Sequence, residues 1–521
     1  MEPSEPSEAR GLGWGALALM GLVALRLLWT EGLLASERAE IYGHAWVVWW
    51  HAEALPAWPD GPGALLSPAR DWPVIDRIPT FGMALLARVV GLVSAINLYL
   101  VGCVGLAFLG GASLARRLGG DAWVGGLALG LCPAFLGVLQ SGLTEDGLVG
   151  LVALCYALLL SRSTGDRLAA GVLLGLLAWC GPVLAWYAGL GFVGLLATRV
   201  VRDGAWASLL ALVPAAAVGL TALWGLGARL SGVGHRYGAQ AAMAEPLWRL
   251  NPWRGVDLAS LLTPLRPDLG EALVREHPGY IGLVVLGLAL WGGRGRYLLL
   301  ALLFAVLSLG RELSFAGEPL GLPNPVAMAL LSLPGGALLN HLGRALVVGG
   351  VFFAAAAAVA AGRLSGRRLL AVRLALLVDL TLLSPMRLPF PVAPTAPPDA
   401  TAALATLPAG PLLVLPIGGP GIHPQRPLFD QSAHGRTLFV DPNSGRPPEV
   451  LRSGETGRWL SSLGQPSPAP TPATFEPPPG VAAMLVAPAQ VAAVEAVVGP
   501  PDARGADGSA VWSLPSPTSP P

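Results

Sequence analysis

Acidic, histidine and tryptophan side chains are concentrated in one short stretch of the sequence, SERAEIYGHAWVVWWHAEAL, at residues 36–55. Glu37, Glu40 and His44 stand here directly after the first long apolar run, in a chain with only 12% charged residues. A carboxylate can take a proton from an attacking hydroxyl group, and carboxylates and imidazoles are metal ligands. Glu40 and Glu37 are therefore the first candidates for catalytic residues, and His44 for substrate binding. The same charges are also typical of the solvated end of a membrane span.

Three tryptophans of this stretch share one face of a predicted helix. Trp46, Trp49 and Trp50 are spaced at i, i+3 and i+4 over residues 41–55. Aromatic helices of this kind lie in the headgroup layer of a membrane, which is the favoured interpretation. Trp46, beside His44, is also a candidate for contact with a substrate.

Two further acids and four cationic groups could contribute to a site. Glu145 and Asp146 stand at the mouth of an apolar run, where they could bind a substrate or simply cap the following helix. Arginine and histidine can bind an anionic group such as a phosphate. The cationic candidates are Arg26, His235, Arg236 and His277. The middle two lie in GVGHRYG, residues 232–238, a Gly-rich segment that is also typical of an ordinary loop.

The composition defines the class of protein that must position these residues. Hydrophobic residues make up 53% of the 521 residues, and the mean hydropathy is +0.60. Soluble domains carry about twice as much charge, so the chain is predicted to be a multi-span membrane protein. The net charge of +1 gives no indication of nucleic-acid binding. The four cysteines lie inside apolar runs without metal-ligand spacing, as small buried residues do.

Apolar runs near the length of a bilayer span predict eleven transmembrane helices. They lie at about residues 12–34, 95–115, 121–139, 145–161, 167–180, 183–200, 205–227, 280–293, 297–310, 344–362 and 368–384. Arginines cluster in alternate connecting loops, at 116–117, 162–167, 199–202, 294–296 and 363–368. Since arginine-rich loops face the cytoplasm, the N-terminus is predicted inside and the C-terminal region outside. The candidate residues then lie on the outer face.

The sequence divides into a membrane domain, 1–384, with outer loops 35–94, 228–279 and 311–343, and an extracytoplasmic domain, 385–521. A short apolar run at 78–93, containing Arg88, is predicted to be interfacial or re-entrant. In the second domain, GPLLVLP (410–416), VAAMLVA (481–487) and AVWSLP (510–515) are typical of short buried strands, and 489–498 of a helix. Pro-rich linkers and a Pro/Ser tail surround this small α/β domain.

The order of several segments resembles that of bacterial C-type glycosyltransferases (GT-C), in particular an uncharacterised branch with a small extracytoplasmic C-terminal domain. The resemblance begins with Glu40, His44 and the three tryptophans after the first span. It continues through AINLYLVGCVGLAFLGGASLARRLGG (95–120), LALGLCPAFLGVLQSGLTEDG (127–147), LLTP (261–264), EHPGYIGLVVLGLAL (276–290), LLVLP (412–416) and HGR (434–436). The fold it implies is an all-α polytopic membrane protein of about eleven spans with a small α/β domain.

This resemblance implies transfer of a sugar from a polyprenyl-phosphate donor to an extracytoplasmic lipid, glycan or protein acceptor at a bacterial inner membrane. Members place an acid after the first span as general base or metal ligand, and Glu40 falls on that position, where the branch usually carries aspartate. Mg²⁺ and Mn²⁺ are the candidate cofactors, neither of them established.

Two other readings stay open. A non-catalytic member could act as a scaffold for envelope assembly. A lipid or solute transporter would need ionisable residues deep inside spans, and only Arg26, Asp379 and Arg373 are candidates. Because Arg26 and Asp379 lie at similar predicted depths in the first and last spans, they are expected to form an ion pair. The alternative is that Arg26 binds the donor phosphate while Asp379 is satisfied locally.

Overall fold

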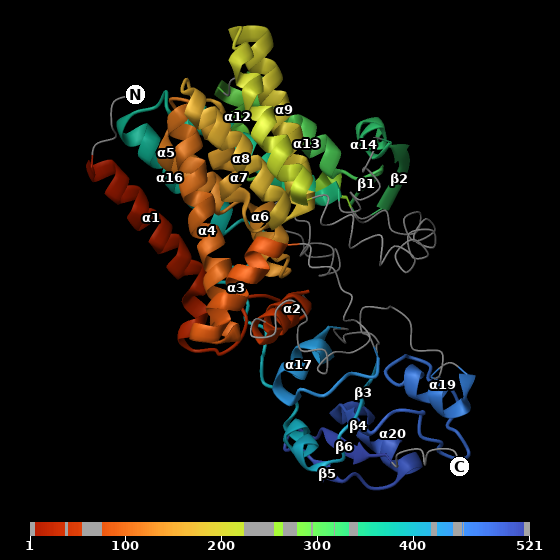
Figure 1. Cartoon of the computed structure of the whole chain (residues 1–521). Coiled ribbons are helices and arrows are strands. Elements are labelled where there is room, and N and C mark those ends of the chain that lie inside the picture. Colours follow the sequence, from red (N-terminus) through yellow and green to blue (C-terminus); the bar gives the residue numbers. More distant parts are fainter. Residues whose placement is uncertain are drawn as a thin grey trace. The chain divides into compact units, whose positions relative to one another are not determined.

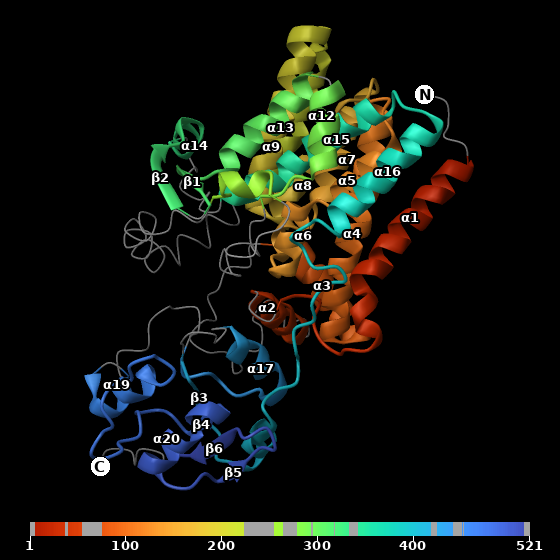
Figure 2. The ribbon, with the colours of Figure 1, turned by 180° about the vertical axis from the view of Figure 1, so that it is seen from behind.

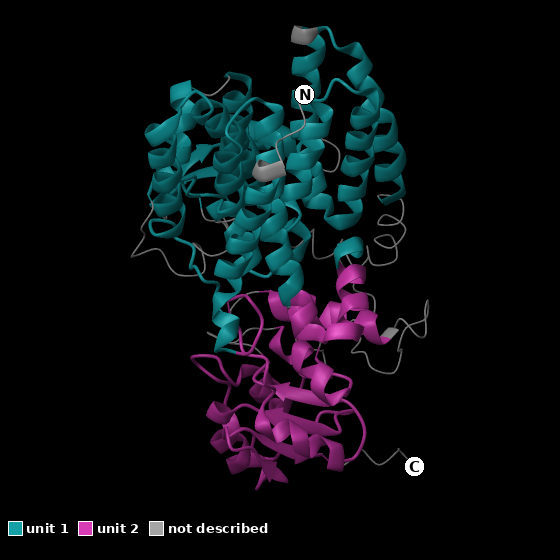
Figure 3. Ribbon diagram, turned by 90° about the vertical axis from the view of Figure 1, so that its left-hand side faces the viewer, with its two compact units in different colours: residues 1–30, 73–79, 97–392 teal, residues 31–72, 80–96, 393–521 magenta. Residues whose placement is uncertain are grey.

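The computed structural model describes residues 6–36, 40–54, 76–222, 255–263, 279–292, 295–316, 318–332, 342–417, 425–440, 451 and 453–514. The chain forms two compact units, shown in teal and magenta in Figure 3. Unit 1 comprises residues 1–30, 73–79 and 97–392, and unit 2 comprises residues 31–72, 80–96 and 393–521. Unit 2 therefore contains the stretch after the first apolar run, which the sequence-based division at residue 384 assigns to the membrane domain.

Unit 1 is built mainly from helices, which are labelled in Figure 1 or, for α15, in Figure 2. They are α1 (Pro6–Ala24), most of α4 (Leu92–Arg117), α5 (Ala122–Gly130), α6 (Pro133–Gln140), α7 (Val149–Leu159), α8 (Thr164–Cys180), α9 (Pro182–Asp203), α12 (Leu283–Gly292), α13 (Gly295–Ser308), α15 (Ala345–Ala361) and α16 (Gly366–Thr381). Short 3₁₀ turns η1 (Leu25–Leu28), η3 (Thr144–Asp146), η4 (Trp206–Ala211) and η8 (Leu342–Arg344) adjoin them.

The helices have the length and composition of a multi-pass membrane protein. Within the described residues, five are long and apolar enough to cross a bilayer, namely Ala9–Leu28, Leu92–Arg117, Ala122–Gln140, Pro182–Val201 and Leu342–Ala361. Shorter apolar helices include Trp206–Ala222, Leu283–Gly292 and Gly295–Ser308. Each of the eleven predicted spans overlaps a helix, but the number of spans remains a prediction.

Helix α15 is the core of unit 1. All of its residues are buried, and it contacts α5, α7, α12 and α13 (α15 is labelled in Figure 2). Its alanine- and glycine-rich sequence, ALVVGGVFFAAAAAVAA, lets neighbouring backbones approach closely, as small residues do between membrane helices. The same device joins α4 to α7, where a Cβ on Gly150 would lie 2.3 Å from the carbonyl oxygen of Leu106.

Asp379 of α16 is buried and is satisfied within its own surroundings. Its carboxylate accepts hydrogen bonds from the hydroxyl of Tyr280 and, at 2.8 Å, from the backbone N–H of Val284. No ion pair joins it to Arg26, which lies in η1, among the residues that the structure describes. The predicted Arg26–Asp379 pair is therefore wrong, because Tyr280 and the start of α12 supply the donors that the carboxylate needs.

A small hairpin follows α13. Strands β1 (Glu312–Phe315) and β2 (Glu318–Pro323) pair antiparallel and lead into α14 (Pro325–Leu331). The carboxylate of Asp257 accepts from the backbone N–H of Ala259 at 2.8 Å and of Ala316 at 3.1 Å. Asp257 thus both starts the turn η6 (Leu258–Leu261) and holds the tip of the hairpin.

Unit 2 contains the predicted small sheet. Its order is β3-β4-β6-β5, formed by β3 (Leu412–Leu415), β4 (Ala483–Val486), β6 (Ala510–Ser513) and β5 (Ala503–Arg504). β3 and β4 are parallel, and the other pairs are antiparallel. The three predicted strands and the helix α20 (Pro488–Val498) are confirmed; the two-residue β5 is too short to leave a sequence pattern.

Both faces of this sheet are covered. One side packs Leu413, Met484 and Trp512 with α19 (Glu455–Ser462) and α20. The other side packs Leu412, Leu485 and Val511 against η9 (Asp399–Thr406). Burial on both faces explains why the strands consist of continuous apolar residues rather than alternating ones.

Helix α2 (Ile41–Ala54) packs against α17 (Arg426–His434) inside unit 2. Trp46 is only 3% exposed, and its indole N–H donates to the side-chain oxygen of Gln431 at 2.8 Å. Trp49 and Trp50 are partly buried against the same cluster. The helix was correctly predicted, but its tryptophan face lies against protein rather than being free for a membrane surface. Helix α2 accordingly belongs to unit 2.

Helix α3 (Arg77–Val90) carries an exposed apolar stripe of Ile78, Phe81, Leu85 and Val89. The guanidinium of Arg88 donates to the backbone carbonyl of Ala52 at 2.8 Å, so the one charge of the predicted interfacial run is tied to the end of α2. An apolar stripe with its charge turned away suits a helix at a membrane surface.

Candidate active site

The turn η3, between α6 and α7, brings two acids into the interior of unit 1. After α6 ends, Gly142 adopts a positive φ of 77°, which lets the chain turn back sharply. The tyrosine hydroxyl of Tyr99 donates to the carbonyl oxygen of Thr144 at 2.7 Å. Thr144, Glu145 and Asp146 are all buried as a result.

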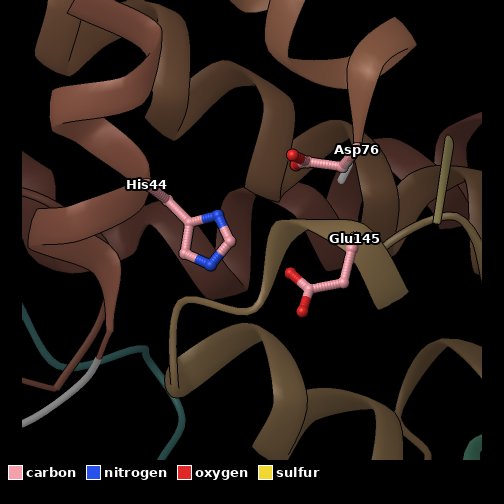
Figure 4. A group of neighbouring side chains, drawn as sticks. All are labelled: His44, Asp76 and Glu145. Carbon is pink, nitrogen blue, oxygen red and sulfur yellow. The ribbon is translucent and has the colours of Figure 1, made fainter. Parts of the chain in front are cut away.

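Thr144 links this turn to a third acid. Its hydroxyl donates to a carboxylate oxygen of Asp76 at 2.6 Å, and both residues are buried. Asp76 immediately precedes α3. Possible ligand oxygens of Asp76 and Glu145 lie within 4.8 Å of each other. Figure 4 shows these two carboxylates; His44, also labelled there, is a residue of α2 in unit 2.

Arg344 binds both acids of η3. Its Nη1 donates to Oε1 of Glu145 at 2.9 Å, and its Nε lies 3.3 Å from Oδ2 of Asp146. Arg344 is 7% exposed, Glu145 9% and Asp146 1%. Buried charges must be paired in this way, because desolvation of a lone ion costs several kcal/mol.

A second arginine follows Asp76 directly. The guanidinium carbon of Arg77 lies 5.0 Å from the ring centroid of Trp179, a cation–π contact. Trp179 is two residues before Gly181, where a Cβ would lie only 2.2 Å from the carbonyl oxygen of Glu145. The end of α8 therefore packs on the backbone of η3, and the contact of Arg77 with Trp179 joins the start of α3 to the end of α8.

Two carboxylates at this separation fit a hard divalent cation. Mg²⁺ and Mn²⁺ prefer oxygen ligands, and Mg²⁺ commonly takes one or two protein carboxylates and completes its shell with water and phosphate oxygens. Asp76 and Glu145 are the residues of unit 1 that would hold such an ion. The fit is chemical, since oxygen donors of this kind suit these ions and not thiophilic ones.

The other predicted site residues have different surroundings. Glu40 is exposed, and its carbonyl accepts from the N–H groups of Gly43 and His44, so it begins α2. Trp46 is enclosed between α2 and α17, and we do not retain it as a substrate contact because its ring and N–H are already engaged. Arg26 lies in η1. Glu37, His235, Arg236 and His277 lie outside the described residues.

Sequence reasoning singled out Glu145 and Asp146 but missed their partners. Asp76 and Arg77 lie in the predicted outer loop 35–94, but neither of them was a candidate for the site, and Arg344 was not one either. The sequence did contain an indication of Asp76 and Arg77. These two charged residues directly precede the apolar run 78–93, just as Glu40 directly precedes the predicted helix 41–55. Nothing local marks Arg344, which is 199 residues from Glu145.

Several solved structures are similar to this chain. The arabinofuranosyltransferase AftD from mycobacteria matches with a TM-score of 0.48 and 16% identity over 92% of this chain and 35% of AftD. The apo oligosaccharyltransferase of Archaeoglobus fulgidus matches with a TM-score of 0.45 and 12% identity over 94% of this chain and 70% of that one. ArnT from Cupriavidus metallidurans, bound to undecaprenyl phosphate, has a TM-score of 0.39 and 14% identity over 99% and 100%.

No family model and no curated protein matches the chain. The similarity to these structures extends over nearly the whole of this chain. This chain spans about a third of the length of AftD. Because every TM-score is below 0.5, the function has to be argued from the residues of this chain.

Proposed function

We propose that this chain is a membrane glycosyltransferase that moves a sugar from a polyprenyl-phosphate donor to a lipid, glycan or protein acceptor on the outer face of the membrane. The observation that carries the proposal is the pair of buried carboxylates, Asp76 and Glu145, with oxygens within 4.8 Å. Arg344 pairs with Glu145, but two carboxylates this close still repel each other, and a cation bound between them would relieve that repulsion. A multi-pass membrane bundle is also where a lipid-held donor can be reached.

In this reaction the acceptor oxygen bonds to the anomeric carbon, the bond from that carbon to the phosphate oxygen breaks, and the acceptor proton passes to a base. A divalent ion on Asp76 and Glu145 would supply positive charge for the departing phosphate. The hydroxyl of Thr144 donates to Asp76 and so orients that carboxylate.

Arg77 is suited to the phosphate itself. A guanidinium is planar, and its N–H groups can donate in pairs to phosphate oxygens. Arg77, which directly follows Asp76 and contacts Trp179, is for that reason the residue we propose for the donor phosphate. The resemblance implies Glu40, at the exposed start of α2, as the candidate base. Glu37 remains a second candidate for that role and His44 a candidate for substrate binding.

The test is transfer by the purified protein in lipid nanodiscs, using a panel of polyprenyl-phosphate sugars and a radiolabelled product. Asp76→Asn and Glu145→Gln should each lower transfer by about 10²–10⁴-fold, the usual contribution of positioned charged groups. Glu318→Gln is the matched control, because Glu318 is an exposed acid on β2. Full activity in the two site variants would refute the proposal.

The two alternatives predict different results, the scaffold in this assay and the transporter in sealed vesicles. A scaffold would bind the donor lipid but release no product with any sugar. A transporter would move lipid or solute across vesicles in proportion to an ion gradient. The local satisfaction of Asp379 by Tyr280 and Val284 speaks against the transporter, because a coupling site needs an acid that exchanges its partner.

A further inference from the structure

Arg344 contacts both adjacent acids of η3, but the surroundings of the two acids differ. Its side chain reaches Glu145 through Nη1 and Asp146 through Nε. The oxygens that approach those of Asp76 belong to Glu145, and Asp146 is not part of that group in the described chain. Asp146, at 1% exposure, is the more deeply buried acid.

The position of Arg344 is set by the most buried helix of the protein. Leu342, Gly343 and Arg344 form η8, and α15 begins at the next residue. Because all of α15 is buried and tightly packed, the backbone of Arg344 has little freedom. Its contacts with Glu145 and Asp146 hold the guanidinium, a positive charge, against the carboxylate of Glu145.

We infer that Arg344 is a positioning residue that orients Glu145 as a ligand, uses Asp146 as its counter-ion, and sets the ion charge that the Asp76–Glu145 site prefers. The inference rests on the cation site of the proposed function. A fixed positive charge repels a bound cation in proportion to the charge of that cation. Arg344 therefore disfavours trivalent ions relative to divalent ones, which suits a site for Mg²⁺ or Mn²⁺.

The experiment compares the affinities of the purified full-length protein for Mn²⁺, by electron paramagnetic resonance, and for Tb³⁺, by luminescence. Arg344→Met should raise the affinity for Tb³⁺ relative to Mn²⁺ by on the order of tenfold or more. Arg344→Lys keeps the charge and should leave the ratio near that of the wild type. A merely structural arginine would alter stability without changing this ratio.

The double variant Arg344→Met with Asp146→Asn guards against misfolding, since it removes an ion pair rather than one partner. It should return the ratio close to the wild-type value. Glu145→Gln should lose binding of both ions, whereas Asp146→Asn should retain it. Equal loss in the two acid variants, an unchanged ratio in folded Arg344→Met, or no ion binding by the wild type would each overturn the inference.

These measurements separate the inference from the function on which it rests. Ion binding with the expected ratios but no sugar transfer would support Arg344 and count against the glycosyltransferase. Sugar transfer by the wild type, together with an unchanged Tb³⁺ to Mn²⁺ affinity ratio in Arg344→Met, would support the glycosyltransferase and count against the role of Arg344.

Discussion

The hydrogen bond between Trp46 and Gln431 should determine how firmly α2 is held in unit 2. Trp46→Phe removes the indole donor from the side-chain oxygen of Gln431, a residue with 0% exposure, at a contact of 2.8 Å. Loss of a buried donor costs about 1–3 kcal/mol, and the smaller ring loses apolar contact with Leu428 and Leu438 worth about 1 kcal/mol. The expected total is about 2–4 kcal/mol.

Hydrogen exchange followed by mass spectrometry measures this locally, since a single unfolding free energy is not defined for a protein of two units. A loss of about 1.4 kcal/mol raises the equilibrium constant for local opening of the helix about tenfold. A loss of about 2–4 kcal/mol should therefore make the amides of α2 and α17 exchange about 30–1000-fold faster in Trp46→Phe. Peptides of α15 should not change, which provides an internal control.

A double-mutant cycle tests the mechanism. Gln431→Leu removes the acceptor, and also a donor to the carbonyl of Arg436 at 2.9 Å. The double variant should lose about 1–2 kcal/mol less stability than the sum of the two single variants. In the double variant no buried donor or acceptor of this hydrogen bond is left without its partner. Strict additivity, or faster exchange confined to α2 alone, would refute the reasoning.

Four further results are expected. A reporter active only outside the cytoplasm should be active when fused after Pro385 and silent at Gly165, and the opposite pattern would overturn the proposed orientation. Glu40→Gln should insert normally yet lower transfer by about 10²–10⁴-fold, as measured with labelled donor; undiminished transfer would remove Glu40 as base. Gly150→Ala should destabilise the α4–α7 contact, since its Cβ would meet the backbone of Leu106 at 2.3 Å; thermal unfolding in detergent, with the unobstructed Gly287→Ala as control, checks this. Burial and the nearby Arg436 lower the pKa of His434 to about 4, so its stabilising contribution is complete above pH 6.5 and is lost as the pH falls towards 4. Burial raises the pKa of Asp430 to about 6, so the contribution of Asp430 to stability is instead lost as the pH rises. To separate the two groups, the wild type is compared with His434→Asn by hydrogen exchange, and the α17 amides of the variant should be less sensitive to acid.

The parts of the fold that local pattern specifies were predictable. The strands Leu412–Leu415, Ala483–Val486 and Ala510–Ser513 are apolar runs between proline- or glycine-rich segments, and α2 follows from its tryptophan spacing. The tasks of these elements depend on distant partners. The periodicity of α2 showed one apolar face but not that Gln431, 385 residues away, would cover it.

In the candidate site, too, some residues could be predicted from local sequence and others could not. Glu145 and Asp146 were noticeable because adjacent acids are rare in a chain with so little charge. Asp76 and Arg344 come from segments far from η3, and their approach depends on the packing of α15 and the start of α3. The predicted Arg26–Asp379 pair failed for a related reason, since matching depth in two spans does not specify which helices are neighbours.

The pairing of α2 with α17 also has a consequence for the order in which the chain is made. Trp46 leaves the ribosome 385 residues before Gln431. At about 5–20 residues per second, that interval is about 20–80 s. Throughout it Trp46, Trp49 and Trp50 lack the α17 surface that covers them in the finished protein. The headgroup layer of the membrane, to which such a stripe is suited, can shelter α2 in the meantime. A chain that stops before residue 425 lacks the α17 surface altogether, so Trp46 then has no Gln431 to bond with.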